Sequence, residues 1–242
     1  AIIAVHLYGF VADVSSLREL ADEFGIYLIE DAAPAIGARQ GDRAAGTFGH
    51  FGCFSFQGAK LLVTGEGGML VTESPELHAR AVKLQEHGRR PGSFFIDELG
   101  FKYKMSNLTA SLGLGQLQRI EAQIQKKRRI NDWYQSSFGP DVPFKFQSEE
   151  RGTDGIAWMT SIVLDEGTDF SRDELMDFLK VNGVDTRPTF PPLNTFGFWH
   201  RAQQDLPVAR HIGGSGINLP SGVGLGRPSV EKISDLIRAF LR

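Results

Sequence analysis

The sequence lacks a second cysteine, an apolar run of membrane-spanning length, and an excess of positive charge. The lone Cys53 excludes an internal disulfide framework and fits a reducing compartment such as the cytoplasm. The missing apolar run gives no sign of a membrane span, and the formal net charge of −3 disfavours nucleic acid as the main partner. The 242 residues, of which 41% are hydrophobic, suffice for one large core or two smaller ones.

Two common nucleotide-binding patterns are also missing. The glycine-rich turn Gly65–Gly68 does not fit G-x-G-x-x-G, because Leu70 stands where the third glycine belongs and a strand-like segment follows. The Gly-Lys-Ser/Thr of a phosphate-binding loop is absent. Nicotinamide dinucleotide and P-loop chemistry are therefore disfavoured. These glycines instead indicate a backbone that passes close to the neighbouring Lys60.

The first part of the sequence alternates between strand-like and helix-like segments. Ser16 and Ser74 have the pattern of helix N-terminal caps, and Gly41–Arg43 that of a hairpin turn. A strand–helix–strand unit requires a parallel sheet with helices on its faces. Strands are predicted at 2–5, 26–29, 51–56 and 69–72, and helices at 16–24, at 74–87 and from Ser106 onward.

The pattern changes after Gly139-Pro140 to an α+β succession. We therefore predict a large domain over residues 1–139 and a smaller α+β domain over 140–242. The basic run at 126–129 is interpreted as a solvated helix face rather than a nucleic-acid surface. In the second domain, strands are predicted at 156–164 and 184–190, and helices at 171–180 and 230–241.

The most informative segment is 55–68, where Lys60 lies between Ser55 and the glycine-rich turn. Upstream, the strand-like segment 28–31 ends on the acid Asp31. A site for pyridoxal phosphate (PLP) needs this grouping: a carboxylate keeps the pyridine nitrogen protonated, a serine takes the phosphate, and a lysine forms a Schiff base. Taken singly, Asp31 could be a polar strand end and Lys60 a surface residue.

Together with further segments, this grouping closely resembles the DegT/DnrJ/EryC1/StrS family of PLP-dependent sugar aminotransferases, which have the aspartate-aminotransferase fold type I. The most specific part is Ser-Phe-x-x-x-Lys followed by Gly-Glu-Gly-Gly. The resemblance runs nearly end to end, through Val5–Gly9, Ile29–Ala33, Gly52–Phe56, Lys60, Gly65–Gly68, His87-Gly88, Gly100–Asn107, Gly115–Leu117 and Asn218–Pro220.

The resemblance implies an α/β fold, a three-layer fold type I large domain followed by a smaller α+β domain. Family members carry a long N-terminal segment with phosphate-binding amides and an aromatic that stacks on the cofactor. The sequence given instead opens without methionine in the strand-like Ala1–Val5. We therefore expect residues 1–139 to be the C-terminal part of the large domain, and the chain to be a piece of a longer protein.

By resemblance, Lys60 is the Schiff-base lysine that also moves the proton, Asp31 the partner of the pyridine nitrogen, and Ser55 a phosphate ligand. The family's site is shared across a homodimer. The position of Lys102 is usually an asparagine that reaches the phosphate held by the neighbouring subunit, a contact that lysine could make as a point charge.

Two other positions depart from the family pattern. Pro34 stands where the family usually has Gln, Glu or His near the phenolic oxygen of the cofactor, and proline has no side-chain donor. Lys104 replaces a common arginine. On the substrate side, the segment 185–188 resembles members that act on 4-keto sugar nucleotides. There Arg187 would bind a phosphate or a carboxylate, or simply form a surface ion pair.

The implied activity is transfer of an amino group from a donor, with L-glutamate expected, to a keto sugar such as a nucleotide-linked 4-keto-6-deoxyhexose, in amino-sugar or surface-polysaccharide biosynthesis. A keto octulosonic or nonulosonic acid is an alternative substrate. A PLP-dependent sugar dehydratase is disfavoured by Lys60, because such relatives have histidine there. A non-catalytic PLP-binding or regulatory relative is the other alternative, which Pro34 and the missing N-terminal segment favour.

Overall fold

The computed structural model describes residues 1–149, 151–198 and 205–242, and the chain forms two compact units. Unit 1 comprises Ala1–Gln125 and Glu149–Trp158, and unit 2 comprises Lys126–Ser148 and Met159–Arg242. The sequence predicted one boundary at 139/140. The division instead falls inside a helix, and 149–158 belongs to unit 1 because a short strand there pairs with a hairpin of that unit. No helix in the described ranges is both long and apolar enough to cross a membrane.

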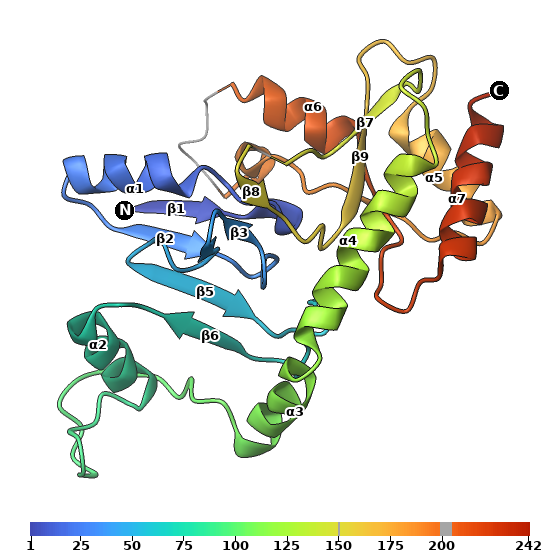
Figure 1. The fold of residues 1–242 in the computed structure, drawn as a ribbon. Coiled ribbons are helices and arrows are strands. Elements are labelled where there is room, and N and C mark those ends of the chain that lie inside the picture. The colour runs from blue at the N-terminus through green and yellow to red at the C-terminus, as the bar shows by residue number, and fades with distance from the viewer. Residues whose placement is uncertain (150, 199–204) are drawn as a thin grey trace. The chain divides into compact units, whose positions relative to one another are not determined.

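The main sheet of unit 1 has the order β1-β2-β5-β6 (Figure 1). Its first three strands are parallel, as predicted, and the fourth runs antiparallel to β5. Helix α1 connects β1 to β2 and packs against both. The carboxyl ends of the parallel strands therefore meet at one edge, where open α/β sheets bind ligands. The elements are β1 (Ile2–Val5), α1 (Val14–Glu23), β2 (Leu28–Asp31), β5 (Phe51–Ser55) and β6 (Gly68–Val71).

A second, three-stranded sheet of unit 1 confirms the predicted hairpin. Strands β3 (Arg39–Gln40) and β4 (Arg43–Ala44) are antiparallel, and β8 (Thr153–Asp154) pairs with β3 from more than a hundred residues away. The short 3-10 helix Leu7–Gly9 follows β1. The pairing of β8 with β3 brings residues 155–158 into unit 1.

Local capping explains where the helices of unit 1 begin. Ser74 caps α2 (Pro75–Gln85), as predicted, and Ser106, where a helix was predicted to start, caps α3 (Asn107–Leu117). For α1 the predicted N-cap, Ser16, was wrong. The N-cap is Asp13, three residues earlier, whose carboxylate accepts the backbone N–H of Ser16. The long helix predicted from Ser106 is two helices, α3 and α4 (Ile120–Ser136).

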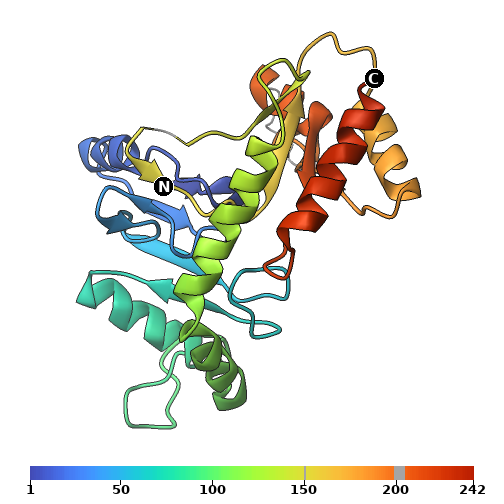
Figure 2. The same ribbon diagram turned by 45° about the vertical axis from the view of Figure 1, so that its right-hand side comes forward.

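Unit 2 is built on an antiparallel sheet of order β10-β11-β9-β7. Helices α5 and α7 lie side by side (Figures 1 and 2). The core lies between this sheet and the helices, and its fully buried members include Ile162 of β9, Leu175 of α5 and Ile237 of α7. The elements are β7 (Phe144–Phe146), β9 (Thr160–Leu164), α5 (Arg172–Val181), β10 (Arg187–Pro188), a 3-10 turn at Leu193–Thr195, α6 (Pro207–Ser215), β11 (Gly216–Leu219) and α7 (Arg227–Phe240).

The basic run of α4 is not uniformly solvated, which corrects the prediction. Lys127 is only 4% exposed, and its ammonium donates to the backbone oxygen of Ser221 at 2.5 Å and to the hydroxyl at 3.2 Å. No carboxylate of the described residues pairs with it. Burial lowers the pKa of Lys127 to about 7. One lysine of the run is thus a core residue of unit 2.

Replacing Lys127 by methionine should flatten the pH dependence of stability. In the folded chain the amine is largely uncharged above about pH 7, whereas in the unfolded chain it stays protonated to about pH 10. Between these values the unfolded state binds the extra proton, so the stability of the unsubstituted protein rises with pH. Urea unfolding should show that, between pH 7 and 10, the free energy of unfolding of the unsubstituted protein rises by up to about 4 kcal/mol relative to that of Lys127→Met. The same substitution at the exposed Lys145 should leave the slope unchanged, and an unchanged slope for Lys127→Met would contradict the assignment.

Candidate cofactor site

Asp31 ends β2 at the carboxyl edge of the unit 1 sheet. Its Oδ1 accepts the backbone N–H of Ala33 at 3.1 Å, whereas Oδ2 has no hydrogen-bond partner in the part of the chain that the structure describes. Neighbouring strands fix its backbone, since Asp31 accepts the N–H of His6, and Ala32 donates to Cys53. The site therefore holds one carboxylate oxygen in place and leaves the other available.

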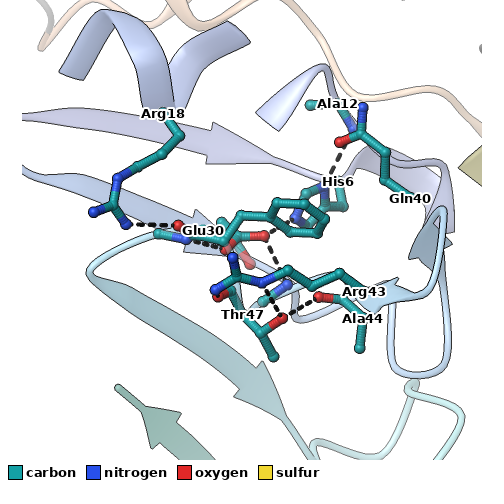
Figure 3. Close-up of polar contacts among 12 residues, drawn as sticks. His6, Ala12, Arg18, Glu30, Gln40, Arg43, Ala44 and Thr47 are labelled. Atoms are coloured by element: carbon teal, nitrogen blue, oxygen red, sulfur yellow. Dashed lines mark hydrogen bonds and ion pairs between the residues drawn. The ribbon is translucent and has the colours of Figure 1, made fainter. Parts of the chain in front are cut away.

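A buried carboxylate lies directly before Asp31 in the sequence. Glu30 is fully buried, and its Oε2 accepts from Nε2 of His6 at 2.9 Å (Figure 3). The other ring nitrogen of His6, Nδ1, accepts the backbone N–H of Ala12 at 3.2 Å. Since Nδ1 is an acceptor, the ring hydrogen is on Nε2, and His6 is a neutral donor to Glu30. His6 is therefore a structural histidine, with both ring nitrogens hydrogen-bonded inside unit 1.

Glu30 also organises the loop that follows β4. Its Oε2 accepts the backbone N–H of Gly46 at 2.7 Å, and its Oε1 that of Gly49 at 2.5 Å. Burial alone would raise the pKa of Glu30, but the hydrogen bonds from His6, Gly49 and Gly46 outweigh it and hold the pKa below its ordinary value. The loop is fixed further by Arg18, which donates to the backbone oxygen of Phe48 (Figure 3). Glu30 thus joins β1, β2 and this loop beside Asp31.

Lys60 lies in a closed loop between β5 and β6. The loop is closed by Phe56, whose N–H donates to Gly67 at 2.9 Å and whose oxygen accepts the N–H of Thr64 at 2.8 Å. Gly67 has a φ of 138°, and a Cβ there would come within 2.8 Å of the Met105 side chain. The positive φ favours glycine at this point, and any other residue would also have to displace the terminal methyl of Met105.

Gln116 of α3 ties the same loop to the helix. Its Oε1 accepts the backbone N–H of Val63 at 3.0 Å, and its Nε2 donates to the oxygen of Val63. The side-chain amide thus pairs with one peptide group as a neighbouring strand would. This accounts for Gln116, which lies 56 residues after the lysine whose loop it supports.

The Lys60 side chain is half-buried, and its Nζ lies 3.9 Å from the ring centroid of Trp158. Burial lowers the pKa of Lys60, while the negative charge of Asp31 acts in the opposite direction. Burial, together with Asp31, also raises the pKa of the Cys53 thiol, so this cysteine is a poor nucleophile. Asp31 and Lys60 therefore share one environment, in which the Lys60 amine loses its proton more easily than it would in water.

Ser55 is the last residue of β5, next to the strand that bears Asp31. Its Oγ accepts the N–H of Gln57 at 3.3 Å, at the start of the lysine loop. Ser55, Asp31 and Lys60 thus lie around the same edge of the sheet. Trp158 was missed by the sequence reasoning, because nothing in the sequence relates it to a lysine 98 positions earlier.

The other two predicted site residues, Lys102 and Arg187, have polar contacts of their own. Lys102 is exposed, its Nζ donates to the oxygen of Lys104 at 3.3 Å, and no contact joins it to Asp31, Ser55 or Lys60 in the described ranges. Arg187 belongs to unit 2, where it is exposed and forms an ion pair with Asp185 at 2.6 Å. The roles of both in binding stay predictions.

The parallel sheet, the aspartate at its carboxyl edge and the half-buried lysine define the fold of the PLP-dependent aminotransferases of fold type I. The model of the DegT/DnrJ/EryC1/StrS aminotransferase family matches residues 1–238, so the chain belongs to this family. GDP-perosamine synthase of Vibrio cholerae is 39% identical over 243 residues, which cover 99% of this chain and 66% of the relative.

Two solved structures show the same fold. The aminotransferase TlmJ from Streptoalloteichus hindustanus is 29% identical with a TM-score of 0.91, covering 99% of this chain and 65% of that one. DesI, solved in the presence of its TDP-sugar product, is 30% identical with a TM-score of 0.90, covering 99% and 62% respectively. The chain thus spans somewhat less than two thirds of the length of the relatives it matches.

Proposed function

We propose that this chain supplies the lysine and the aspartate of a PLP-dependent aminotransferase that moves an amino group from L-glutamate to a keto sugar. The observation that carries the proposal is the placement of Lys60 near enough to Asp31 for the carboxylate charge to act on its amine. Burial lowers the pKa of the lysine, and the aspartate has a free Oδ2 at the carboxyl edge of the sheet. Either residue alone occurs in many proteins, whereas a half-buried lysine beside a strand-end aspartate matches the needs of this cofactor.

The residues present fit PLP. Oδ2 of Asp31 is available to hold the pyridine nitrogen, Ser55 to bind the phosphate, and the Lys60 amine to form the covalent link. PLP, when bound, supplies an electron sink for the carbon that bears the transferred amino group. The free amine of Lys60 would take a proton from that carbon and deliver it to the second carbon of the amino transfer, a task for which its lowered pKa suits it. We further propose a cytoplasmic homodimer in which Lys102 serves the partner's phosphate site.

For the acceptor we propose a nucleotide-linked 4-keto-6-deoxyhexose. The relative from Vibrio cholerae is a GDP-perosamine synthase, and DesI was solved with a TDP-sugar product, so both act on nucleotide sugars. Arg187 is the proposed ligand of the substrate phosphate or carboxylate, and would have to leave Asp185 to act so. The pathway would be amino-sugar or surface-polysaccharide biosynthesis.

The first test is the absorbance spectrum of the protein with PLP, before and after L-glutamate. It should be recorded on this chain and on a version extended at its N-terminus to the length of the relatives. A band of lysine-bound PLP that glutamate removes, with release of 2-oxoglutarate, supports the proposal. A band that ignores every amino donor in both versions would favour a non-catalytic PLP-binding protein instead.

Replacing Asp31 by asparagine should leave PLP bound and slow the glutamate half-reaction by about 10²–10³-fold. The amide oxygen can still accept from Ala33, but the negative charge that keeps a pyridine nitrogen protonated is lost. Stopped-flow absorbance measures the rate. Asp42→Asn, in the exposed hairpin, is the control and should react at the unsubstituted rate. An Asp31→Asn protein as fast as this control would remove the aspartate from the mechanism.

A further inference from the structure

The aromatic wall beside Lys60 has no role in the mechanism above. We propose that Trp158, supported by Tyr8, is a positioning residue that fixes the Lys60 amine for capture of PLP, an inference that rests on the proposed function. Trp158 is 8% exposed and Tyr8 is 3% exposed. Both belong to unit 1, like the lysine.

Trp158 holds the lysine segment at two points. The Nζ of Lys60 lies over the indole ring, 3.9 Å from its centroid. The indole Nε1–H donates to the backbone oxygen of Ala59 at 2.8 Å, directly before the lysine. One side chain thus fixes both the backbone entering Lys60 and the end of its side chain. A lysine has four flexible side-chain torsions, so a fixed contact at its tip restricts where the amine can lie.

The backbone around this wall is strained. Tyr8 has a φ of 55° and Ala157 a φ of 44°, both in the left-handed region that residues other than glycine rarely adopt. The rings of Tyr8 and Trp158 stack with their centroids 6.4 Å apart and their planes at 21°. Two distant segments thus each hold an unfavourable conformation where they meet beside the reactive lysine. Strain of this kind persists where the surrounding structure enforces it, and it clusters at functional sites.

The two segments also fit each other closely. The N–H of Ile156 donates to the oxygen of Gly9 at 3.0 Å. A Cβ on Gly9 would come within 2.8 Å of the Trp158 backbone nitrogen and within 3.0 Å of the oxygen of Pro34. Only glycine fits at position 9, because any side chain would collide with these backbone atoms. The Gly9 position is therefore explained by the placement of Trp158, and through it by Lys60.

The indole ring acts on the amine in two ways. Its face attracts the ammonium form, and its bulk keeps water away from one side of the lysine. Burial lowers the pKa of Lys60 and outweighs the opposing effect of the Asp31 charge. Loss of the ring should therefore both loosen the amine and move its titration to higher pH.

The test compares Trp158→Leu with Trp158→Phe in the protein extended to the length of the relatives. The readout is the rate constant of PLP capture as a function of pH, followed by absorbance without any amino donor. Trp158→Leu should capture PLP about tenfold more slowly at pH 7, with its pH midpoint shifted upward. Trp158→Phe keeps a ring face and should stay within about threefold of the unsubstituted rate.

Trp133→Leu is the matched control. Trp133 also carries a lysine over its ring, Lys126 at 4.5 Å, but lies in unit 2, so its replacement should not alter PLP capture. If Trp158→Leu does not fold by circular dichroism, Trp158→Met takes its place with the same expectations. A non-aromatic variant that keeps the unsubstituted rate and pH profile overturns the positioning role and leaves the proposed function standing. Absence of PLP capture by the unsubstituted protein would overturn the proposed function itself.

Discussion

Lys60→Ala should lower the rate of amino transfer by at least about 10³-fold, the largest effect of any single substitution in this chain. The lysine is the proposed covalent partner of PLP and the proposed base that moves the proton. Both roles need a primary amine at this position. Burial lowers the pKa of two described lysines, Lys60 and Lys127, and of these only Lys60 has an aspartate that acts on its charge. PLP bound without the covalent link should absorb at a different wavelength from the unsubstituted protein.

The measurement is single-turnover kinetics with L-glutamate, monitored by absorbance and by release of 2-oxoglutarate. Lys145→Ala is the control, because Lys145 is exposed and, among the described residues, forms an ion pair with Asp165 at 3.4 Å. A small primary amine in the buffer should restore part of the proton transfer to Lys60→Ala, since the amine is the missing group. Retention of ordinary turnover by Lys60→Ala would refute the proposed mechanism.

Features set by neighbouring residues were predicted well from the sequence. The helix predicted from Ser171 is α5, where Ser171 and Glu174 form a capping box, and Ser74 caps α2 as predicted. The parallel pairing of β1 with β2 follows from the intervening helix. Asp31 and Lys60 could be picked out because each lies in a motif whose residue types and spacing are specific. The match of the family model then confirmed the resemblance.

Features that depend on distant contacts could not be predicted. Lys127 is buried against a backbone oxygen 94 residues later in the chain, which the sequence does not reveal. Its basic neighbours instead suggested a solvent-exposed lysine. Strand β9 begins at Thr160 rather than 156, because the preceding residues belong to unit 1. β10 spans only two residues, and the helix α6 with the strand β11 was not predicted. In each case tertiary pairing, rather than local propensity, decides the structure.

The same limit applies to the buried hydrogen bonds of Glu30, next to Asp31. Glu30-Asp31 looked like one polar strand end, but a strand points successive side chains to opposite faces. Asp31 thereby keeps an oxygen available for a ligand, while Glu30 is fully buried among three donors. The family resemblance pointed to Asp31, but nothing in the sequence indicated the hydrogen-bond network of Glu30. In the proposed function, adjacent acids of the same strand would thus serve binding and structure separately.

Glu30→Ala should destabilise the protein by about 3–5 kcal/mol, because it removes the acceptor of a buried hydrogen-bond network. The Nε2–H of His6 and the N–H groups of Gly46 and Gly49 would all be left without their partner inside the protein. Glu30→Gln should cost less but remain destabilising. One amide oxygen cannot replace two carboxylate oxygens, and its NH₂ group would face other donors.

Urea unfolding at pH 7 measures this loss, and Glu19→Gln on the exposed face of α1 is the control, with an expected change below about 0.5 kcal/mol. The pH dependence of the free energy of unfolding separates the contribution of the Glu30 charge from that of its hydrogen-bond geometry. Because the folded-state pKa of Glu30 is lowered, its contribution is complete above the unfolded value of about 4.3 and is lost as the pH falls through the folded value. The difference between the unsubstituted protein and Glu30→Gln should therefore shrink in acid. A constant difference down to pH 3 would mean that hydrogen-bond geometry, and not the ionised carboxylate, holds β1, β2 and the Gly46–Gly49 loop together beside Asp31.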